Sequence, residues 1–170
     1  FGPNVFKNKI VSEYYEPGSA FKPIIMSIAL DAKEVEPQTT FIDDGPLKID
    51  DFEIKNSTNI YWGKTTMSEV LAKSLNTGMS FVAKKLGKEL MYQYLKDFGF
   101  GEYTNIQLEG ESKGDLVYFS QWSKAQMLTT SFGQGIIVTP LQLATAWCAL
   151  ANGGKLMEPY IVDTIIRGDK

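Results

Sequence analysis

Near its start the chain reads Glu16-Pro17-Gly18-Ser19-Ala20-Phe21-Lys22-Pro23, and apolar residues then recur at the spacing of a helix. The Pro-Gly pair interrupts whatever precedes it. We therefore predict a helix from Ser19 to about Ala32, with Ser19 as its N-cap residue. Pro23 is compatible with this start, because the first turn of a helix has no intrahelical partner for the N–H that proline lacks.

This helix start brings a serine and a lysine onto one face, because Ser19 and Lys22 are three residues apart. The Lys22 ammonium can then reach the Ser19 hydroxyl. With no histidine and one cysteine in the chain, a Ser-His-Asp triad, a histidine-ligated metal site and a zinc site are excluded. Lysine remains as the candidate base, provided that burial or nearby positive charge lowers its pKa. The alternative is an N-cap serine followed by a surface lysine.

The composition is that of one globular domain or a large piece of one, with 170 residues, 44% hydrophobic and 22% charged. The net charge of −3 with dispersed lysines argues against nucleic acid as a partner. The longest apolar runs, 23–30 and 141–151, are too short to span a bilayer. Cys148 is predicted to be a small core residue. Because the chain begins at Phe1 without a signal peptide, we expect an excised segment of a longer protein.

Several further elements follow from local patterns. Alternation of apolar and polar residues over 39–55 predicts a small β-hairpin or paired short strands around Asp44-Gly45-Pro46. The acidic residues there lack calcium-loop spacing and are interpreted as a solvated face. An amphipathic helix is predicted over 90–98, and Thr139-Pro140-Leu141-Gln142 predicts a capped helix start. Residues 1–13 are predicted to be extended, and 161–166 to form a last strand.

Two tripeptides fit a Ser-x-Asn pattern. Ser57-Thr58-Asn59 lies in a hydrophilic loop, where turn formation alone explains it. Ser74-Leu75-Asn76 follows an amphipathic helix whose apolar stripe, continued by one turn, reaches the serine. Asn76-Thr77-Gly78 permits a bend before a helix resumes and ends at Gly87, so that both polar side chains of the second tripeptide face a shared cleft. From these residues alone, a serine tolerated inside a helix is the favoured interpretation.

Three segments resemble class B penicillin-binding proteins, the serine transpeptidases that cross-link peptidoglycan. Residues 14–23 resemble their active-site serine segment, and 71–79 resemble their Ser-x-Asn segment. Residues 133–159 carry a similar Gly-x-Gly, Thr-Pro, Gln-Leu-Ala and Ala-Asn-Gly-Gly series. The resemblance reverses the preference stated above and favours Ser74 over Ser57.

The resemblance implies a catalytic site of Ser19, Lys22 and Ser74, with Asn76 binding substrate. Ser19 would attack the penultimate D-alanine carbonyl of a stem peptide, with Lys22 as its base. Ser74 would relay a proton to the leaving amine, and Asn76 would hold both the lysine and the acyl-side amide of the substrate. β-Lactams would acylate Ser19 in the same way. No metal and no cofactor are implied.

The resemblance also implies partners and a location. The partners are peptidoglycan stem peptides, β-lactam antibiotics and, through the parent protein, a membrane glycosyltransferase and other cell-wall synthesis proteins acting in cell shape and division. The location is the extracytoplasmic (periplasmic) face of the bacterial cell membrane, with an anchor outside this chain.

The chain departs from the family in lacking a Lys-Thr-Gly motif, since Lys64-Thr65-Thr66 has no glycine and precedes Ser74. In the family that motif lies on a strand that binds the substrate carboxylate and supplies an oxyanion-hole N–H. We therefore expect residues 1–170 to be a partial transpeptidase domain of mainly α (α+β) class. It would be the helical part of the penicillin-binding and serine β-lactamase-like fold, with a small hairpin and most of the central sheet missing. By itself it should acylate slowly or not at all. Alternatives are a class D β-lactamase or penicillin-sensor domain, and a non-catalytic binding or scaffold domain.

Overall fold

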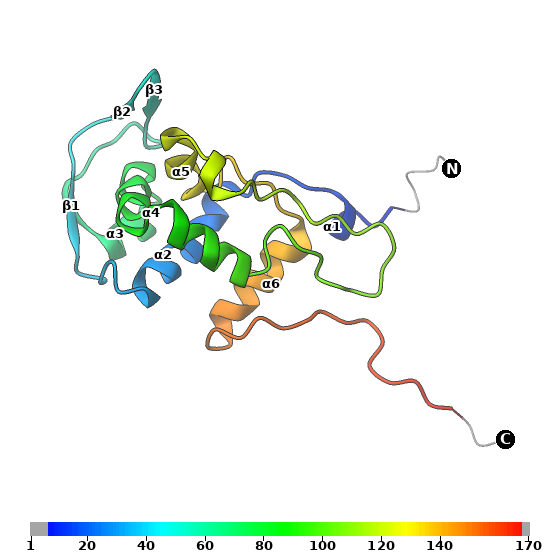
Figure 1. Ribbon diagram of the computed structural model, residues 1–170. Coiled ribbons are helices and arrows are strands. Elements are labelled where there is room, and N and C mark those ends of the chain that lie inside the picture. Colours follow the sequence, from blue (N-terminus) through cyan, green and yellow to red (C-terminus); the bar gives the residue numbers. More distant parts are fainter. Residues whose placement is uncertain (1–6, 168–170) are drawn as a thin grey trace.

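Helices dominate the architecture (Figure 1). The computed structural model describes residues 7–167. The helical elements are α1 (Lys9–Ser12), η2 (Gly18–Phe21), α2 (Lys22–Asp31), α3 (Met67–Ala72), α4 (Asn76–Asp97), η3 (Phe119–Gln121), α5 (Lys124–Thr130) and α6 (Pro140–Ala151). The strands are β1 (Thr40–Asp43), β2 (Leu47–Ile49), β3 (Phe52–Ile54) and β4 (Gly63–Thr66). The predicted mainly α class with a small β component is confirmed.

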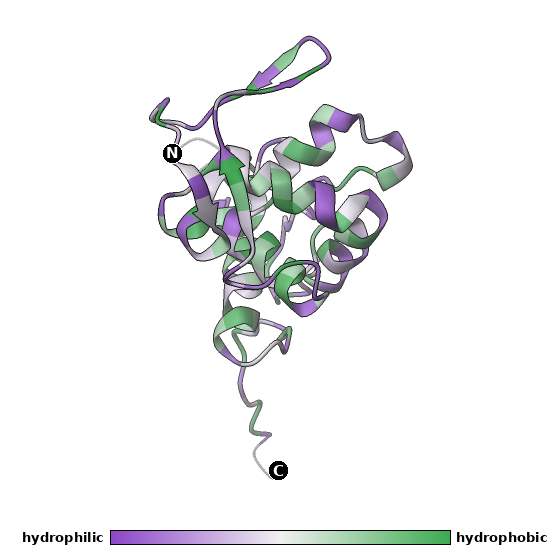
Figure 2. Ribbon diagram, turned by 90° about the vertical axis from the view of Figure 1, so that its left-hand side faces the viewer, coloured by the Kyte–Doolittle hydropathy of each residue, from purple (hydrophilic) through white to green (hydrophobic). Residues whose placement is uncertain are grey.

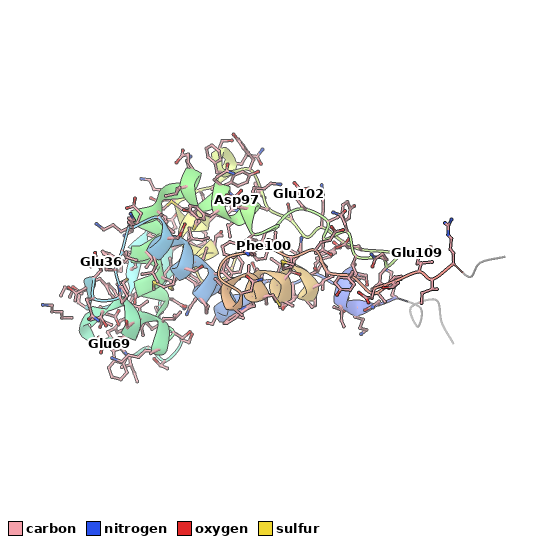
Figure 3. The ribbon with its side chains drawn as sticks, turned by 90° about the horizontal axis from the view of Figure 1, so that it is seen from below. Glu36, Glu69, Asp97, Phe100, Glu102 and Glu109 are labelled. Atoms are coloured by element: carbon pink, nitrogen blue, oxygen red, sulfur yellow. The ribbon has the colours of Figure 1, made fainter. Side chains whose placement is uncertain are left out.

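The core is built around α2, which packs against α4 and α6 (Figure 1). A helix that is apolar on nearly every side belongs in the interior, and α2 buries five apolar residues, Ile24, Ile25, Met26, Ile28 and Ala29. Just before it, the ring of Phe21 meets Phe100 edge to face at 5.1 Å (Phe100 is labelled in Figure 3). Complete burial of a side chain such as Phe21 contributes about 1.5–3 kcal/mol. This packing holds the start of α2 in place.

The predicted helix is present, but α2 begins at Lys22 and not directly after Ser19, which is not its N-cap. The chain first makes the 3₁₀ turn η2, closed by the Lys22 N–H donating to the Ser19 carbonyl, and α2 follows with Phe21 at its N-cap. Neither helix start has a side-chain cap. The reason lies in Gly18, whose N–H donates to the Gly133 carbonyl at 3.0 Å and whose φ is +57°. This contact between distant segments, and not a local side-chain cap, fixes the direction in which the chain enters α2.

Two antiparallel strand pairs form, with a pairing that differs from the predicted hairpin. β1 pairs with β4, with Thr40 opposite Thr66, whereas β2 pairs with β3. The tight turn lies at Asp50-Asp51, where Asp50 has a φ of +49°, and not at Asp44-Gly45-Pro46. Strand β4 was not predicted, because its short polar sequence carries no alternation of its own. The β2–β3 hairpin projects from the helical body (Figure 2).

The predicted bend between two helices is present but lies earlier in the chain. Ser74 itself has a φ of +54°, and Asn76 is already the first residue of α4. Gly78 serves packing and not bending, because a Cβ there would lie 2.5 Å from Val70 Cγ2. Gly87 interrupts α4 with a φ of +71°, as predicted.

One more local prediction is confirmed, and several others are wrong. The capped start of α6 is confirmed, since Thr139 and Gln142 form a reciprocal capping box. Residues 9–12 form α1 instead of an extended lead-in, and residues 1–6 lie outside the described part. Residues 161–166 form no strand and are exposed. Cys148 is exposed and not a core residue, because α6 turns a different face inward, formed by Gln142, Ala146 and Ala149.

Candidate active site

Lys22 is a buried lysine at the first position of α2. Its side chain is 1% exposed, and its Nζ donates to the carbonyl oxygen of Ser74 at 2.6 Å and to Ser74 Oγ at 2.9 Å. No ion pair involves Lys22 within residues 7–167. Burial disfavours the charged ammonium and lowers the pKa of Lys22 from 10.5 to about 8. The alternative of a surface lysine is therefore wrong, and a substantial neutral fraction exists near physiological pH.

Ser74 owes its position to a left-handed backbone between α3 and α4. Its N–H donates to the Leu71 carbonyl and ends α3, while its φ of +54° directs its carbonyl and hydroxyl to the Lys22 ammonium. A left-handed serine costs about 1 kcal/mol. Such conformations persist where surrounding contacts enforce them and are concentrated at functional sites. Ser57, by contrast, is exposed in the turn after β3.

Ser19 lies on η2, one turn before Lys22, and its side chain is exposed. Among the hydrogen bonds of the described residues, the Lys22 ammonium goes to Ser74 and not to the Ser19 hydroxyl. The site therefore combines the exposed Ser19 with the buried Lys22, whose ammonium donates to a second serine, Ser74. A nucleophile needs such an adjacent base to act at neutral pH.

The turn that carries Ser19 is held by the Gly-x-Gly segment, which sequence reasoning linked to the family without giving it a role. A Cβ on Gly133 would lie 2.2 Å from the Gly18 carbonyl oxygen, so only glycine permits this approach. Next to it, the Gly135 N–H donates to Glu16 Oε1 at 2.7 Å. The glycines of this segment, Gly133 and Gly135, were the sequence signal for such a contact, because glycine allows two backbones to approach closely.

Asn76 faces the β2–β3 hairpin. Its Nδ2 donates to the Lys55 carbonyl at 2.8 Å, and Lys22 is not among its partners in the described part of the chain. Asn76 borders an open cleft of about 600 Å³. The other lining residues come from the segment before η2, the hairpin and the residue after it, α5 and the Gly-x-Gly loop: Glu16, Phe52, Glu53, Ile54, Lys55, Ala125, Thr129, Phe132, Gln134 and Gly135.

Residues 7–167 contain no cluster of side chains of the kind that binds a metal ion. No group of three His, Cys, Asp or Glu side chains there could hold a metal ion. Figure 3 shows labelled carboxylates, among them Glu36, Glu69 and Glu109, spread from one end of the molecule to the other. Within the same residues no helix is long and apolar enough to cross a membrane.

The helical fold centred on α2 agrees with what comparison with known families shows. The family model described as the penicillin binding protein transpeptidase domain matches residues 2–170, and the chain belongs to this family. Stage V sporulation protein D of Bacillus subtilis (strain 168) is 39% identical over 161 residues, 94% of this chain and 25% of that protein. Peptidoglycan D,D-transpeptidase FtsI of Escherichia coli (strain K12) is 32% identical over 148 residues, 87% of this chain and 25% of that protein.

Solved structures agree at the level of the fold. The apo structure of the TP domain of Burkholderia pseudomallei penicillin-binding protein 3 matches with a TM-score of 0.87 and 31% identity, over 94% of this chain and 48% of that one. The resemblance drawn from the motifs is thus confirmed for family and fold. The chain spans about a quarter of the length of the curated relatives named above.

Proposed function

We propose that the protein is a peptidoglycan D,D-transpeptidase that uses Ser19 as its nucleophile and Lys22 as its base. The observation that carries the proposal is the buried Lys22 ammonium, with a pKa of about 8, held by Ser74 one turn from an exposed serine. Membership of the transpeptidase family and the names of the relatives agree with it.

Acylation then proceeds with a balanced proton transfer. Ser19 Oγ attacks the carbonyl carbon of the penultimate D-alanine, and its proton passes to neutral Lys22. The C–N bond breaks, and the terminal D-alanine leaves with a proton that returns from Lys22 through the Ser74 hydroxyl. Ser74 suits this relay because a hydroxyl accepts from the ammonium while donating its own hydrogen elsewhere.

Deacylation reverses these roles. An amine from a second stem peptide attacks the ester carbonyl on Ser19, gives up a proton to the Lys22–Ser74 pair, and forms the cross-link as Ser19 Oγ recovers a proton. Asn76 contributes binding, because its Nδ2 is engaged by Lys55 while its Oδ1 can accept from a substrate amide N–H. β-Lactams are expected to acylate Ser19 and to stop at the ester.

The wider setting is part of the proposal. Residues 1–170 would be a partial transpeptidase domain, because a Lys-Thr-Gly motif is absent from the sequence and one oxyanion donor is therefore missing. The whole protein would work at the extracytoplasmic face of a bacterial membrane, held by a segment outside this chain. Its partners would be stem peptides and, through the parent protein, a glycosyltransferase and other cell-wall synthesis proteins.

The test is labelling of the full-length protein with a fluorescent penicillin, followed by mass mapping of the adduct. A stable adduct on Ser19, absent in Ser19→Ala and retained in Ser57→Ala, is the expected result. Rapid turnover of the adduct would instead indicate a β-lactamase. No labelling would indicate a binding or scaffold domain, and an adduct on another serine would overturn the assignment of the nucleophile.

A further inference from the structure

A buried carboxylate lies near the site, in a segment whose acidic residues were interpreted as a solvated face. Asp43, the last residue of β1, is 1% exposed, so that interpretation is wrong for this residue. Its carboxylate accepts from Thr77 Oγ1 at 2.7 Å, from Asn56 Nδ2 at 3.1 and 3.4 Å, and from the Trp62 N–H at 3.1 Å. Every one of these donors is neutral.

Asn56 joins this carboxylate to the start of α4. Asn56 is 2% exposed, and its Oδ1 accepts the Thr77 N–H at 3.2 Å and lies 3.0 Å from Thr77 Oγ1. The first N–H groups of a helix have no intrahelical partner, and the N-cap residue, Leu75, has no side chain that can supply one. Asn56 therefore caps α4 from 21 residues away, and the Asp43 charge lies at the positive end of the helix dipole.

The loop that carries Lys55 and Asn56 is hydrogen-bonded to the first two residues of α4. Asn76 donates to the Lys55 carbonyl, and Thr77 bonds to Asn56. These bonds lie two and three residues after Ser74, the left-handed residue that accepts from Lys22. On its other side the turn is held by α3, through the Leu75 N–H donating to the Val70 carbonyl at 2.9 Å. The strained turn is thus fixed from both ends.

We propose that Asp43, Asn56 and Thr77 form a positioning cluster that holds the Ser74–Asn76 turn against Lys22 and so sets the rate of acylation. The inference rests on the function proposed above. An apolar trio would fill the same space without the cost of burying a carboxylate. Directional hydrogen bonds, however, fix the orientation of the turn, which apolar contacts do not. Among the hydrogen bonds of the described residues, none joins these three side chains to Ser19 or Lys22, and we infer that they act through Ser74 and Asn76.

The test compares Thr77→Val with Thr77→Ser in the full-length protein. Valine keeps the shape and removes the hydroxyl, while serine keeps the hydroxyl. We expect Thr77→Val to lower the second-order rate of penicillin acylation by about 10- to 100-fold, the cost typical of a small misplacement of reacting groups. Thr77→Ser should stay within about threefold of the parent, since it retains the bond to Asp43.

A matched control is Thr65→Val. Thr65 is also buried, but its hydroxyl donates to the Gly63 carbonyl of its own strand. This change should leave the acylation rate unaltered. The second readout is the pH profile: loosening the turn admits water to Lys22, so the midpoint of the profile should move to higher pH in Thr77→Val and stay fixed in Thr65→Val.

The outcomes separate the two proposals. Normal acylation in Thr77→Val, or an equal loss in Thr65→Val with an unmoved midpoint, would overturn the positioning role and leave the transpeptidase assignment intact. Absence of acylation in the parent protein would overturn both. If Thr77→Val fails to fold, Asn56→Ala replaces it, because that change removes the cap and keeps the Thr77–Asp43 bond. A parent-like rate and midpoint in Asn56→Ala would overturn the inference.

Discussion

The pH dependence of acylation tests the buried base directly. If neutral Lys22 accepts the proton of Ser19, the rate follows the neutral fraction. With a pKa of about 8, that fraction is about 1% at pH 6, 10% at pH 7 and 50% at pH 8. The acylation rate should rise about tenfold from pH 6 to 7, and only about twofold from pH 8 to 10. A solvated lysine with a pKa of 10.5 would instead give a rise of about 75-fold over that upper interval.

The assay is stopped-flow acylation of the full-length protein by a fluorescent penicillin from pH 6 to 10, corrected for alkaline hydrolysis of the drug. Lys22→Arg is the control, because a guanidinium keeps the positive charge but does not release its proton. We expect this variant to remain folded and to lose acylation at every pH. A rate that climbs more than tenfold between pH 8 and 10 would refute a buried base. Acylation retained in Lys22→Arg would show that another group takes the proton.

Three further predictions address the other parts of the site. Ser74→Ala should slow acylation by about 10²- to 10⁴-fold, as for a lost proton-transfer group, while Ser57→Ala should have little effect; the reverse ranking would assign the relay to the wrong serine. Gly133→Ala should lower the melting temperature and the acylation rate more than Gly154→Ala does. Both glycines have a positive φ, but only a Cβ at Gly133 would collide with backbone atoms, those of Gly18. Equal effects of the two substitutions would contradict the packing argument. If, as proposed, the second oxyanion donor lies on a strand outside residues 1–170, this chain by itself should acylate about 10²- to 10³-fold more slowly than the full-length protein; equal rates would mean that the cleft is complete without further strands.

The sequence allowed prediction wherever the determining interaction is local. The Thr139–Gln142 capping box and the break at Gly87 involve neighbours within a few residues, and both are confirmed. The helix predicted after Pro17-Gly18 is present and ends at Asp31 as its apolar spacing indicates, although its first turn is the 3₁₀ turn η2. These signals depend on backbone geometry that a short window of sequence encodes.

Features that depend on distant partners escaped prediction. Asp43 looked like one more surface acid because its partners, Asn56 and Thr77, lie 13 and 34 residues along the chain. The hydrogen-bond partner of the buried Lys22 ammonium is likewise distant, since Ser74 lies 52 residues away. Gly78 suggested a bend, yet its lack of a side chain serves contact with Val70, which no local pattern reveals.

The β2–β3 hairpin forms one wall of the open cleft, and its two ends are held differently. It is a single pair of three-residue strands whose base is buried, with Ile54 6% exposed in the core, while Phe52 near its tip is 66% exposed. Asn76 and Thr77 of α4 hydrogen-bond to Lys55 and Asn56, the two residues that follow β3. A two-stranded ribbon by itself is only marginally stable in water, so the hairpin depends on these contacts at its base. Removing the base contacts would therefore release the whole wall, whereas a substitution at Phe52 would alter the surface of the cleft and leave the core intact.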